Sequence, residues 1–204
     1  MSTIEAVMRM APVIPVLVMD DVSHAAPIAQ ALVRGGLPVL EVTLRTPAAL
    51  DVIREMKQVA GAVVGAGTVL KPADLDAALS VGSEFIVSPG LTEALGSAAI
   101  ASGVPFLPGT ATASDVMRGL DMGLRHFKFF PAEASGGTAA LKAIAGPFGG
   151  VRFCPTGGIR QDTAYDWLAL EAVLCVGGSW IVPPGTPDLD AIEQAARAAR
   201  GLAQ

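Results

Sequence analysis

Cysteine and histidine are scarce in this sequence. Its 204 residues include two of each, Cys154 and Cys175, and His24 and His126. Two cysteines are too few for a disulfide scaffold, and both lie in apolar runs where a free cysteine packs as a small hydrophobic residue. The two histidines are far apart and have no carboxylate motif beside them, unlike the ligands of a zinc site. We therefore expect core cysteines, structural histidines, and neither a metal nor another cofactor.

An excess of positive charge and long apolar runs are also lacking. Lysine and arginine number 14 against 19 acidic residues, which gives a net charge of -5. A nucleic-acid partner usually requires a clustered basic face. No apolar run reaches the roughly 20 residues that cross a membrane, and the N-terminus has no secretory-signal pattern. We expect a cytoplasmic protein that binds neither nucleic acid nor a membrane.

Apolar residues, in contrast, are abundant. They make up 51% of the chain, which is enough for a large core. The 23 glycines and 15 prolines are scattered rather than clustered, so no linker divides the sequence. We expect residues 1–204 to form a single domain.

Short apolar runs rich in β-branched residues recur along the chain. They predict eight strands, at residues 12–19, 38–44, 63–69, 85–90, 104–110, 126–132, 152–158 and 172–181. Alanine-rich segments with helical spacing lie between many of them, and several of these end in glycine. The strands lack clean polar alternation, which is typical of parallel sheets covered on both faces.

Eight alternating units predict a single-domain (β/α)8 TIM barrel with a short N-terminal helix. The alternative is a doubly wound open sheet. We favour the barrel because no Gly-x-Gly-x-x-Gly turn follows the first strand, and because polar or distinctive residues end many strands rather than one switch point. These residues are Glu41, Arg45, Thr68, Pro89, Thr110, Lys128, Thr156 and Ser179.

The stretch "HFKFFPA" contains a single cation, Lys128, in an apolar strand. Alternation predicts that Phe127 and Phe129 face the helices, while Lys128 and the potential substrate-binding residue Phe130 point into the barrel. A lysine can also extend its amine along apolar surface to water, but here water is near only at the barrel mouth. Burial favours the neutral amine, which is the nucleophile in Schiff-base chemistry. Lys128 is therefore the predicted Schiff-base lysine.

The stretch "VLEVTLRT" supplies an acid and an anion-binding group. Glu41 is the only charge in the second strand, and Arg45 lies where that strand gives way to a loop. The two side chains could form a purely structural ion pair. We favour proton transfer for Glu41 and bidentate binding of a planar carboxylate for Arg45.

Two glycine pairs end the last two predicted strands, in "PTGGIR" and "VGGSW". Backbone N–H groups at such positions can approach a phosphate, and barrels commonly bind phosphate with these two loops. Either pair alone could be a tight turn that needs positive φ. Together the loops predict a phosphate site, formed by Thr156, Gly157, Gly158, Gly178 and Ser179.

Several motifs, in order over nearly the whole chain, resemble the 2-dehydro-3-deoxy-phosphogluconate (KDPG) aldolase family, which includes 4-hydroxy-2-oxoglutarate (KHG) aldolases. They are "EVTLRT", "VGAGTVL", "SPGLT", "FKFFPAE", "IAGPF", "RFCPTGGI" and "VLCVGGSW". The resemblance implies a metal-free class I mechanism and a homotrimer. It implies that Lys128 is the Schiff-base lysine, Glu41 the general acid/base, and that Arg45, Thr68 and Pro89 surround the pyruvate end of the substrate. It also implies contacts of the two glycine loops with the distal hydroxyls and phosphate.

The activity that the resemblance implies is cleavage of 2-dehydro-3-deoxy-6-phosphogluconate to pyruvate and glyceraldehyde 3-phosphate. The alternatives are cleavage of 4-hydroxy-2-oxoglutarate or of the galactonate epimer, a metal-dependent pyruvate aldolase, and a non-catalytic sugar-phosphate-binding barrel. The last of these would not need a buried amine opposite Glu41. One departure from the family is Thr163, where an asparagine is frequent, and it affects the first turn of the helix after the first glycine loop.

Overall fold

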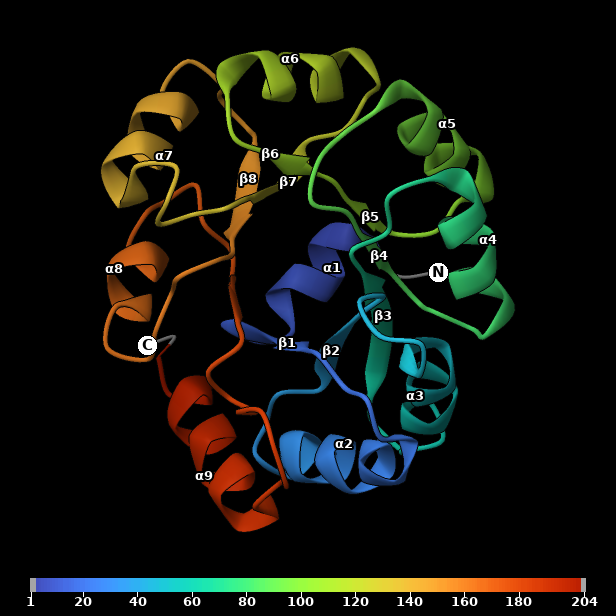
Figure 1. Ribbon diagram of the computed structural model, residues 1–204. Coiled ribbons are helices and arrows are strands. Elements are labelled where there is room, and N and C mark those ends of the chain that lie inside the picture. Colours follow the sequence, from blue (N-terminus) through green and yellow to red (C-terminus); the bar gives the residue numbers. More distant parts are fainter. Residues whose placement is uncertain (1–2, 203–204) are drawn as a thin grey trace.

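The computed structural model describes residues 3–202 as an α/β fold in which helices surround parallel strands (Figure 1). The strands are β1 Val13–Leu17, β2 Val39–Thr43, β3 Val63–Gly67, β4 Ile86–Val87, β5 Phe106–Leu107, β6 Gly109–Thr110, β7 His126–Phe129, β8 Arg152–Pro155 and β9 Val176–Gly178. The α-helices are α1 Ile4–Arg9, α2 Ala25–Arg34, α3 Ala49–Met56, α4 Pro72–Ser80, α5 Glu93–Ser102, α6 Ala113–Asp121, α7 Gly137–Ala145, α8 Ala164–Leu168 and α9 Leu189–Arg200. A short 3-10 helix, η1 Val22–His24, precedes α2.

All the strand pairings are parallel within the described residues, and they form two sheets. The six-stranded sheet has the order β5-β4-β3-β2-β1-β9, and the three-stranded sheet has the order β6-β7-β8. Only Pro108 separates β5 from β6 in the chain. Isolated bridges from Phe153 to Val173 and from Thr156 to Gly177 connect the β8 segment with the β9 segment. The predicted alternation of parallel strands and helices is therefore confirmed.

The strands are shorter than the apolar runs that predicted them. The run 104–110 contains two two-residue strands, because Pro108 has no N–H for a ladder hydrogen bond. In the run 172–181, only Val176–Gly178 is strand. Apolar runs indicate burial, which continues into the turns at both ends, so they overestimate strand length.

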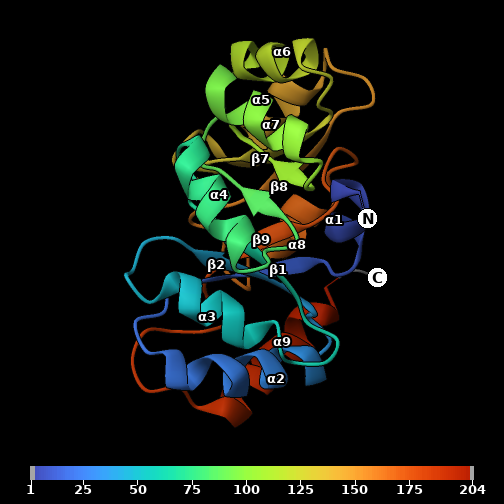
Figure 2. The same cartoon turned by 90° about the vertical axis from the view of Figure 1, so that its right-hand side faces the viewer.

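Apart from α1, the α-helices lie around the outside of the sheets, as Figures 1 and 2 show from two directions, and their buried apolar residues belong to the main core cluster. Their ends have recognisable caps. The Thr92 hydroxyl accepts a hydrogen bond from Leu95 N at the start of α5, and Gly103 ends that helix in the left-handed conformation. Thr112 and Asp115 form a reciprocal capping box at α6. None of the helices between residues 3 and 202 is long and apolar enough to cross a bilayer.

Helix α1 is the predicted N-terminal helix, and it lies in the middle of the ring of helices in Figure 1. Its buried residues Val7 and Met8 belong to an apolar cluster with strand residues and with both cysteines, which are free and buried as expected. Its Glu5 is 3.4 Å from His126, the first residue of β7. Helix α1 therefore covers the N-terminal end of the strands, and the polar residues that follow the strands lie at the other end.

Candidate active site

Lys128 and Glu41 form a buried ion pair between two strands. Lys128 Nζ lies 3.0 Å from Glu41 Oε1, and the two side chains are only 6% and 4% exposed. Lys128 belongs to β7 and Glu41 to β2, which are not hydrogen-bonded neighbours. The two side chains therefore meet across the interior of the fold, as the alternation along "HFKFFPA" predicts.

The neighbouring phenylalanines also lie as predicted. Phe127 packs on the outside against Gly119 of α6, and Phe129 packs against Trp167 of α8 with ring centroids 6.2 Å apart. The Phe130 ring is on the lysine side, with its centroid 5.3 Å from Lys128 Nζ. An aromatic face at this distance attracts an ammonium group and limits the positions that it can take.

Space for the Glu41 carboxylate comes from Gly67 on the neighbouring strand β3. A Cβ at Gly67 would overlap Glu41 Oε1, Cγ and Cδ. Strand β3 pairs with β2 in register, with Thr43 opposite Gly67. Sequence reasoning missed this residue, although the small residues of "VGAGT" were a visible signal. Gly67 is therefore part of the site through the volume that it leaves free.

Arg45 and Thr68 lie together at the ends of β2 and β3. Arg45 Nε donates to Thr68 Oγ1 at 3.2 Å, and the Arg45 side chain is exposed. Thr68 has φ of 59°, a left-handed conformation that costs a threonine about 1–3 kcal/mol and is common at functional sites. Glu41 is paired with Lys128 rather than with Arg45, so the alternative of a structural Glu41–Arg45 pair is not observed. Among residues 3–202 no other group accepts a hydrogen bond from the Arg45 guanidinium, so its remaining donors can bind an anion.

Pro89 follows β4 and lies beside the strand next to the lysine. Its carbonyl occupies the place that a Cβ at Gly109 would need. Gly109 is in turn the residue opposite Lys128 in the β6–β7 pairing. The predicted neighbours of the pyruvate end therefore follow three adjacent strands of the six-stranded sheet, β2, β3 and β4, whereas Lys128 belongs to the three-stranded sheet.

The first glycine pair adopts the backbone conformation that only glycine takes easily. Gly157 has φ of 104° and Gly158 has φ of 81°. Thr156, just before them, is buried, and its N–H donates to Phe129 O at 2.9 Å. The loop thus runs beside the end of β7, because its first residue is bonded to Phe129, the residue that follows Lys128.

The second glycine pair is explained by close packing rather than by a left-handed backbone. A Cβ at Gly177 would overlap the Thr156 hydroxyl, and one at Gly178 would overlap the Trp180 ring. Neither residue is among those with positive φ. These glycines are therefore explained by close packing, with the exposed Ser179 following them at the end of β9.

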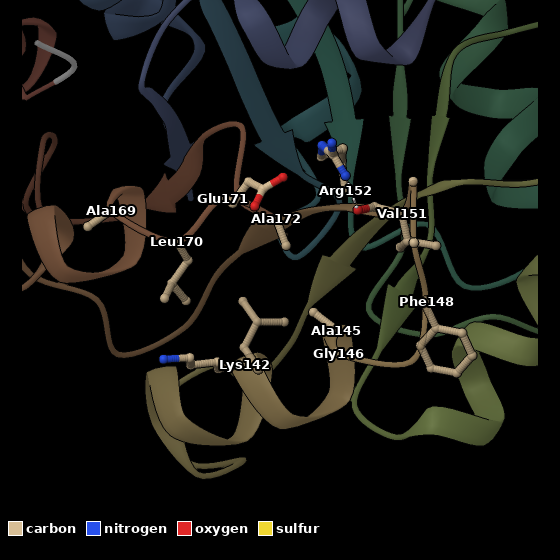
Figure 3. Close-up of a pocket in the computed structure, with 13 residues that line it drawn as sticks. Lys142, Ala145, Gly146, Phe148, Val151, Arg152, Ala169, Leu170, Glu171 and Ala172 are labelled. Carbon is tan, nitrogen blue, oxygen red and sulfur yellow. Dashed lines mark hydrogen bonds between the residues drawn. The ribbon is translucent and has the colours of Figure 1, made fainter.

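A pocket of about 520 Å³ lies elsewhere, at the other end of β8 (Figure 3). It is lined by the C-terminal turn of α7, by the segment leading into β8, and by residues 169–172. In the figure Lys142 points away from Arg152 and Glu171, so the charged groups do not converge on one point. Because Arg152 begins β8 and Thr156 follows its end, this pocket is separate from the Lys128 site.

Comparison with known proteins gives consistent matches. A family model for KDPG and KHG aldolase matches residues 4–195. The 2-dehydro-3-deoxy-phosphogluconate aldolase of Zymomonas mobilis is 59% identical over 199 residues, which are 98% of this chain and 96% of that protein.

Two solved structures have nearly the same fold. The 2-keto-3-deoxy-6-phosphogluconate aldolase of Zymomonas mobilis ZM4 with 3-phosphoglycerate has a TM-score of 0.96 and 58% identity, over 98% of this chain and 95% of that one. The KDPG aldolase of Legionella pneumophila, with pyruvate captured at low pH as a covalent carbinolamine intermediate, has a TM-score of 0.93 and 42% identity, over 98% of both chains.

Proposed function

The chain belongs to the KDPG and KHG aldolase family, and we propose that it is a class I aldehyde-lyase that reversibly cleaves 2-dehydro-3-deoxy-6-phospho-D-gluconate to pyruvate and D-glyceraldehyde 3-phosphate. The main support from the geometry is the buried contact between Lys128 Nζ and Glu41 Oε1. A sugar-phosphate-binding protein without catalysis would not need this pair. A lysine and a carboxylate within hydrogen-bond distance are what Schiff-base formation requires.

The first steps form a covalent intermediate on Lys128. Glu41 accepts a proton from the ammonium group, and the free amine attacks the C2 carbonyl of the substrate to give a carbinolamine. Glu41, directly or through water, returns the proton to the C2 hydroxyl, which leaves as water and gives an iminium ion. The positively charged iminium is the electron sink for the next step.

Carbon–carbon cleavage then uses the same carboxylate. Glu41 removes the proton of the C4 hydroxyl, the C4–O bond becomes the carbonyl of glyceraldehyde 3-phosphate, and the C3–C4 electron pair moves into C3–C2 to give an enamine. Protonation of the enamine at C3 and hydrolysis of the resulting iminium release pyruvate and the free lysine. One carboxylate can serve all proton transfers because they occur in sequence.

The two ends of the substrate have different proposed contacts. Arg45, with Thr68 and Pro89 nearby, binds the carboxylate at the pyruvate end, since a guanidinium matches a planar carboxylate. The Phe130 ring limits the position of the reacting carbons. The distal hydroxyls and phosphate bind at the two loops that follow β8 and β9, at Thr156, Gly157, Gly158, Gly178 and Ser179.

We also infer that the two sheets form one closed (β/α)8 barrel in a single domain. The supporting observations are the single residue between β5 and β6 and the bridges between the β8 and β9 segments. Family membership further supports a homotrimer and a cytoplasmic location as proposals. Cleavage of 4-hydroxy-2-oxoglutarate or of the galactonate epimer is the second candidate activity, because the matching family includes KHG aldolases.

The decisive experiment is trapping with borohydride in the presence of pyruvate. Reduction of the iminium should give one stable adduct, located by peptide mapping on Lys128. The internal controls are Lys57, Lys71 and Lys142, which are less buried and whose ammonium groups stay hydrated. An adduct on another lysine, or no adduct, would contradict the Schiff-base mechanism and favour the binding-protein alternative.

A second test concerns metal dependence. Because the iminium is the electron sink, prolonged treatment with EDTA should leave turnover unchanged. Activity that is lost with EDTA and restored by zinc or magnesium would instead support a metal-dependent pyruvate aldolase.

A further inference from the structure

Glu133 lies in the turn between β7 and α7 and is bonded to the first glycine loop through its backbone. Its N–H donates to Gly157 O at 3.0 Å, and the preceding Ala132 N–H donates to Thr156 O at 2.8 Å. These bonds continue the β7–β8 ladder past the end of both strands. The segment that follows Lys128 and the loop proposed to bind phosphate are therefore directly connected.

The Glu133 side chain extends this connection to the helix after the loop. Glu133 Oε1 accepts a hydrogen bond from Trp167 Nε1 at 3.1 Å. Trp167 belongs to α8, is 1% exposed, and packs its ring against Phe129 of β7. A buried indole N–H needs an acceptor, and Glu133 supplies it.

The stem of the same side chain packs on the loop backbone. A Cβ at Gly158 would lie 2.7 Å from both Cβ and Cγ of Glu133. Gly158 is thus confined between its own left-handed conformation and the Glu133 stem. The position of the loop at residues 156–158 is therefore restricted by backbone hydrogen bonds and by the Glu133 side chain, which is itself bonded to α8.

We propose that Glu133 is a positioning residue for the substrate phosphate: its hydrogen bond to Trp167 keeps its stem against Gly158 and fixes the loop N–H groups where the phosphate binds. This inference rests on the proposed phosphate contacts of Gly157 and Gly158. Glu133 acts as an acceptor rather than through its negative charge, which is unfavourable beside a phosphate. An uncharged acceptor of the same shape should therefore perform the same role.

Three variants test this role. Glu133→Ala removes the acceptor and the packing on Gly158, Trp167→Phe removes only the donor and keeps a ring beside Phe129, and Glu133→Gln keeps an acceptor oxygen. We expect the first two to lower kcat/KM for the phosphorylated substrate by up to about tenfold, the size expected for the loss of one hydrogen bond, and Glu133→Gln to retain most activity. The double variant Glu133→Ala/Trp167→Phe should lose no more than Glu133→Ala alone.

Two further measurements separate positioning from general damage. Proton exchange of the pyruvate methyl group depends on Lys128 and Glu41 but not on phosphate, so it should stay unchanged in all three variants. Cleavage of an unphosphorylated 4-hydroxy-2-oxoacid should also change little. The matched control is Glu171→Ala, an exposed glutamate at the other end of β8, which should affect neither activity.

The outcomes distinguish this inference from the proposed function. Equal kcat/KM of the unmodified enzyme for phosphorylated and unphosphorylated substrates would overturn the phosphate loop itself. A clear preference for phosphate that is unaffected by Glu133→Ala and Trp167→Phe would overturn only the role of Glu133. Equal losses in Glu133→Gln and Glu133→Ala would also overturn it, because the acceptor would then not be the relevant property.

Discussion

Strand β7 has two basic side chains, two residues apart, and each faces a carboxylate. Lys128 is 3.0 Å from Glu41, with both side chains almost fully buried. His126 is 3.4 Å from Glu5, with side-chain exposures of 18% and 44%. Because side chains two apart on a strand share a face, both pairs lie on the inner side, one deep in the interior and the other at its N-terminal end.

The surroundings of the two pairs differ more than their distances. Glu41 lies in a space left by Gly67 on β3, and Lys128 lies beside an aromatic ring. Glu5 also bonds Arg9, and it comes from helix α1 rather than from a strand. A basic side chain close to a carboxylate is therefore insufficient to indicate catalysis. In this molecule the pair between the strands is almost fully buried, as the proposed chemistry requires, whereas the pair at the helix connects α1 with β7.

Replacing each carboxylate by its amide should have very different effects on turnover. Glu41→Gln should lower kcat by about 10² to 10⁴, the usual contribution of a positioned acid/base. Glu5→Gln is the matched control and should leave kcat within a factor of two or so, since exposed ion pairs contribute little. Steady-state cleavage and pyruvate proton exchange measure both. Near-normal rates for Glu41→Gln in both assays would make the buried carboxylate structural.

The free space around Glu41 can be tested separately from its charge. Gly67→Ala should push the carboxylate away from Lys128, and a displacement of about 1 Å can lower the rate about 10²-fold. Gly149→Ala is the control, because a Cβ there meets nothing within 4 Å and φ is not positive. Both variants are compared by kcat and by thermal unfolding. Full activity of Gly67→Ala would show that Glu41 does not need its observed position.

Much of this site follows from the sequence, and the exceptions have a common cause. Alternation along β7 predicts the inward direction of Lys128, and the lone charge of β2 predicts Glu41. Gly67 and the Glu133–Trp167 bond are not predicted, because they depend on which residues of other elements lie opposite. The same limit applies to the packing of Gly178, because the sequence does not predict that a Cβ there would overlap the Trp180 ring.

In the fold, too, the sequence predicts local features better than features that depend on contacts between distant segments. The apolar runs predict the order of strands and helices, because burial on both faces leaves a clear composition. They do not predict where each strand ends, since this depends on available N–H partners, as Pro108 illustrates between β5 and β6. Which strands pair with one another likewise depends on contacts between segments that are far apart in the sequence, so the apolar runs do not predict it.

Arg45 extends the comparison to a cation that contacts a hydroxyl, Thr68 Oγ1, rather than a carboxylate. If it binds the substrate carboxylate, Arg45→Ala should raise KM for pyruvate in the exchange assay about tenfold or more, with a smaller change in kcat. Arg54→Ala, on the exposed face of α3, is the control. A fall in kcat without a change in KM would mean that Arg45 acts on the chemical step instead.

The smallest expected effect concerns the pH dependence of stability at the His126–Glu5 pair. Burial lowers the pKa of His126 below its ordinary value of 6.5, Arg9 and Arg152 lower it further, and Glu5 only partly opposes them. The unfolded chain therefore binds the proton more readily than the folded one. The stability that the protein gains from a neutral His126 is therefore complete above about pH 6.5, and it decreases as the pH falls from there towards the folded-state pKa.

His126→Gln cannot be protonated, so its thermal midpoint should fall less than that of the unmodified protein between pH 7.5 and pH 5.5. Glu5 remains ionised throughout this range, because its own pKa is lowered by the hydrogen bond from Arg9. If the thermal midpoints of the two proteins changed equally with pH, the pKa of His126 would be the same in the folded and the unfolded state.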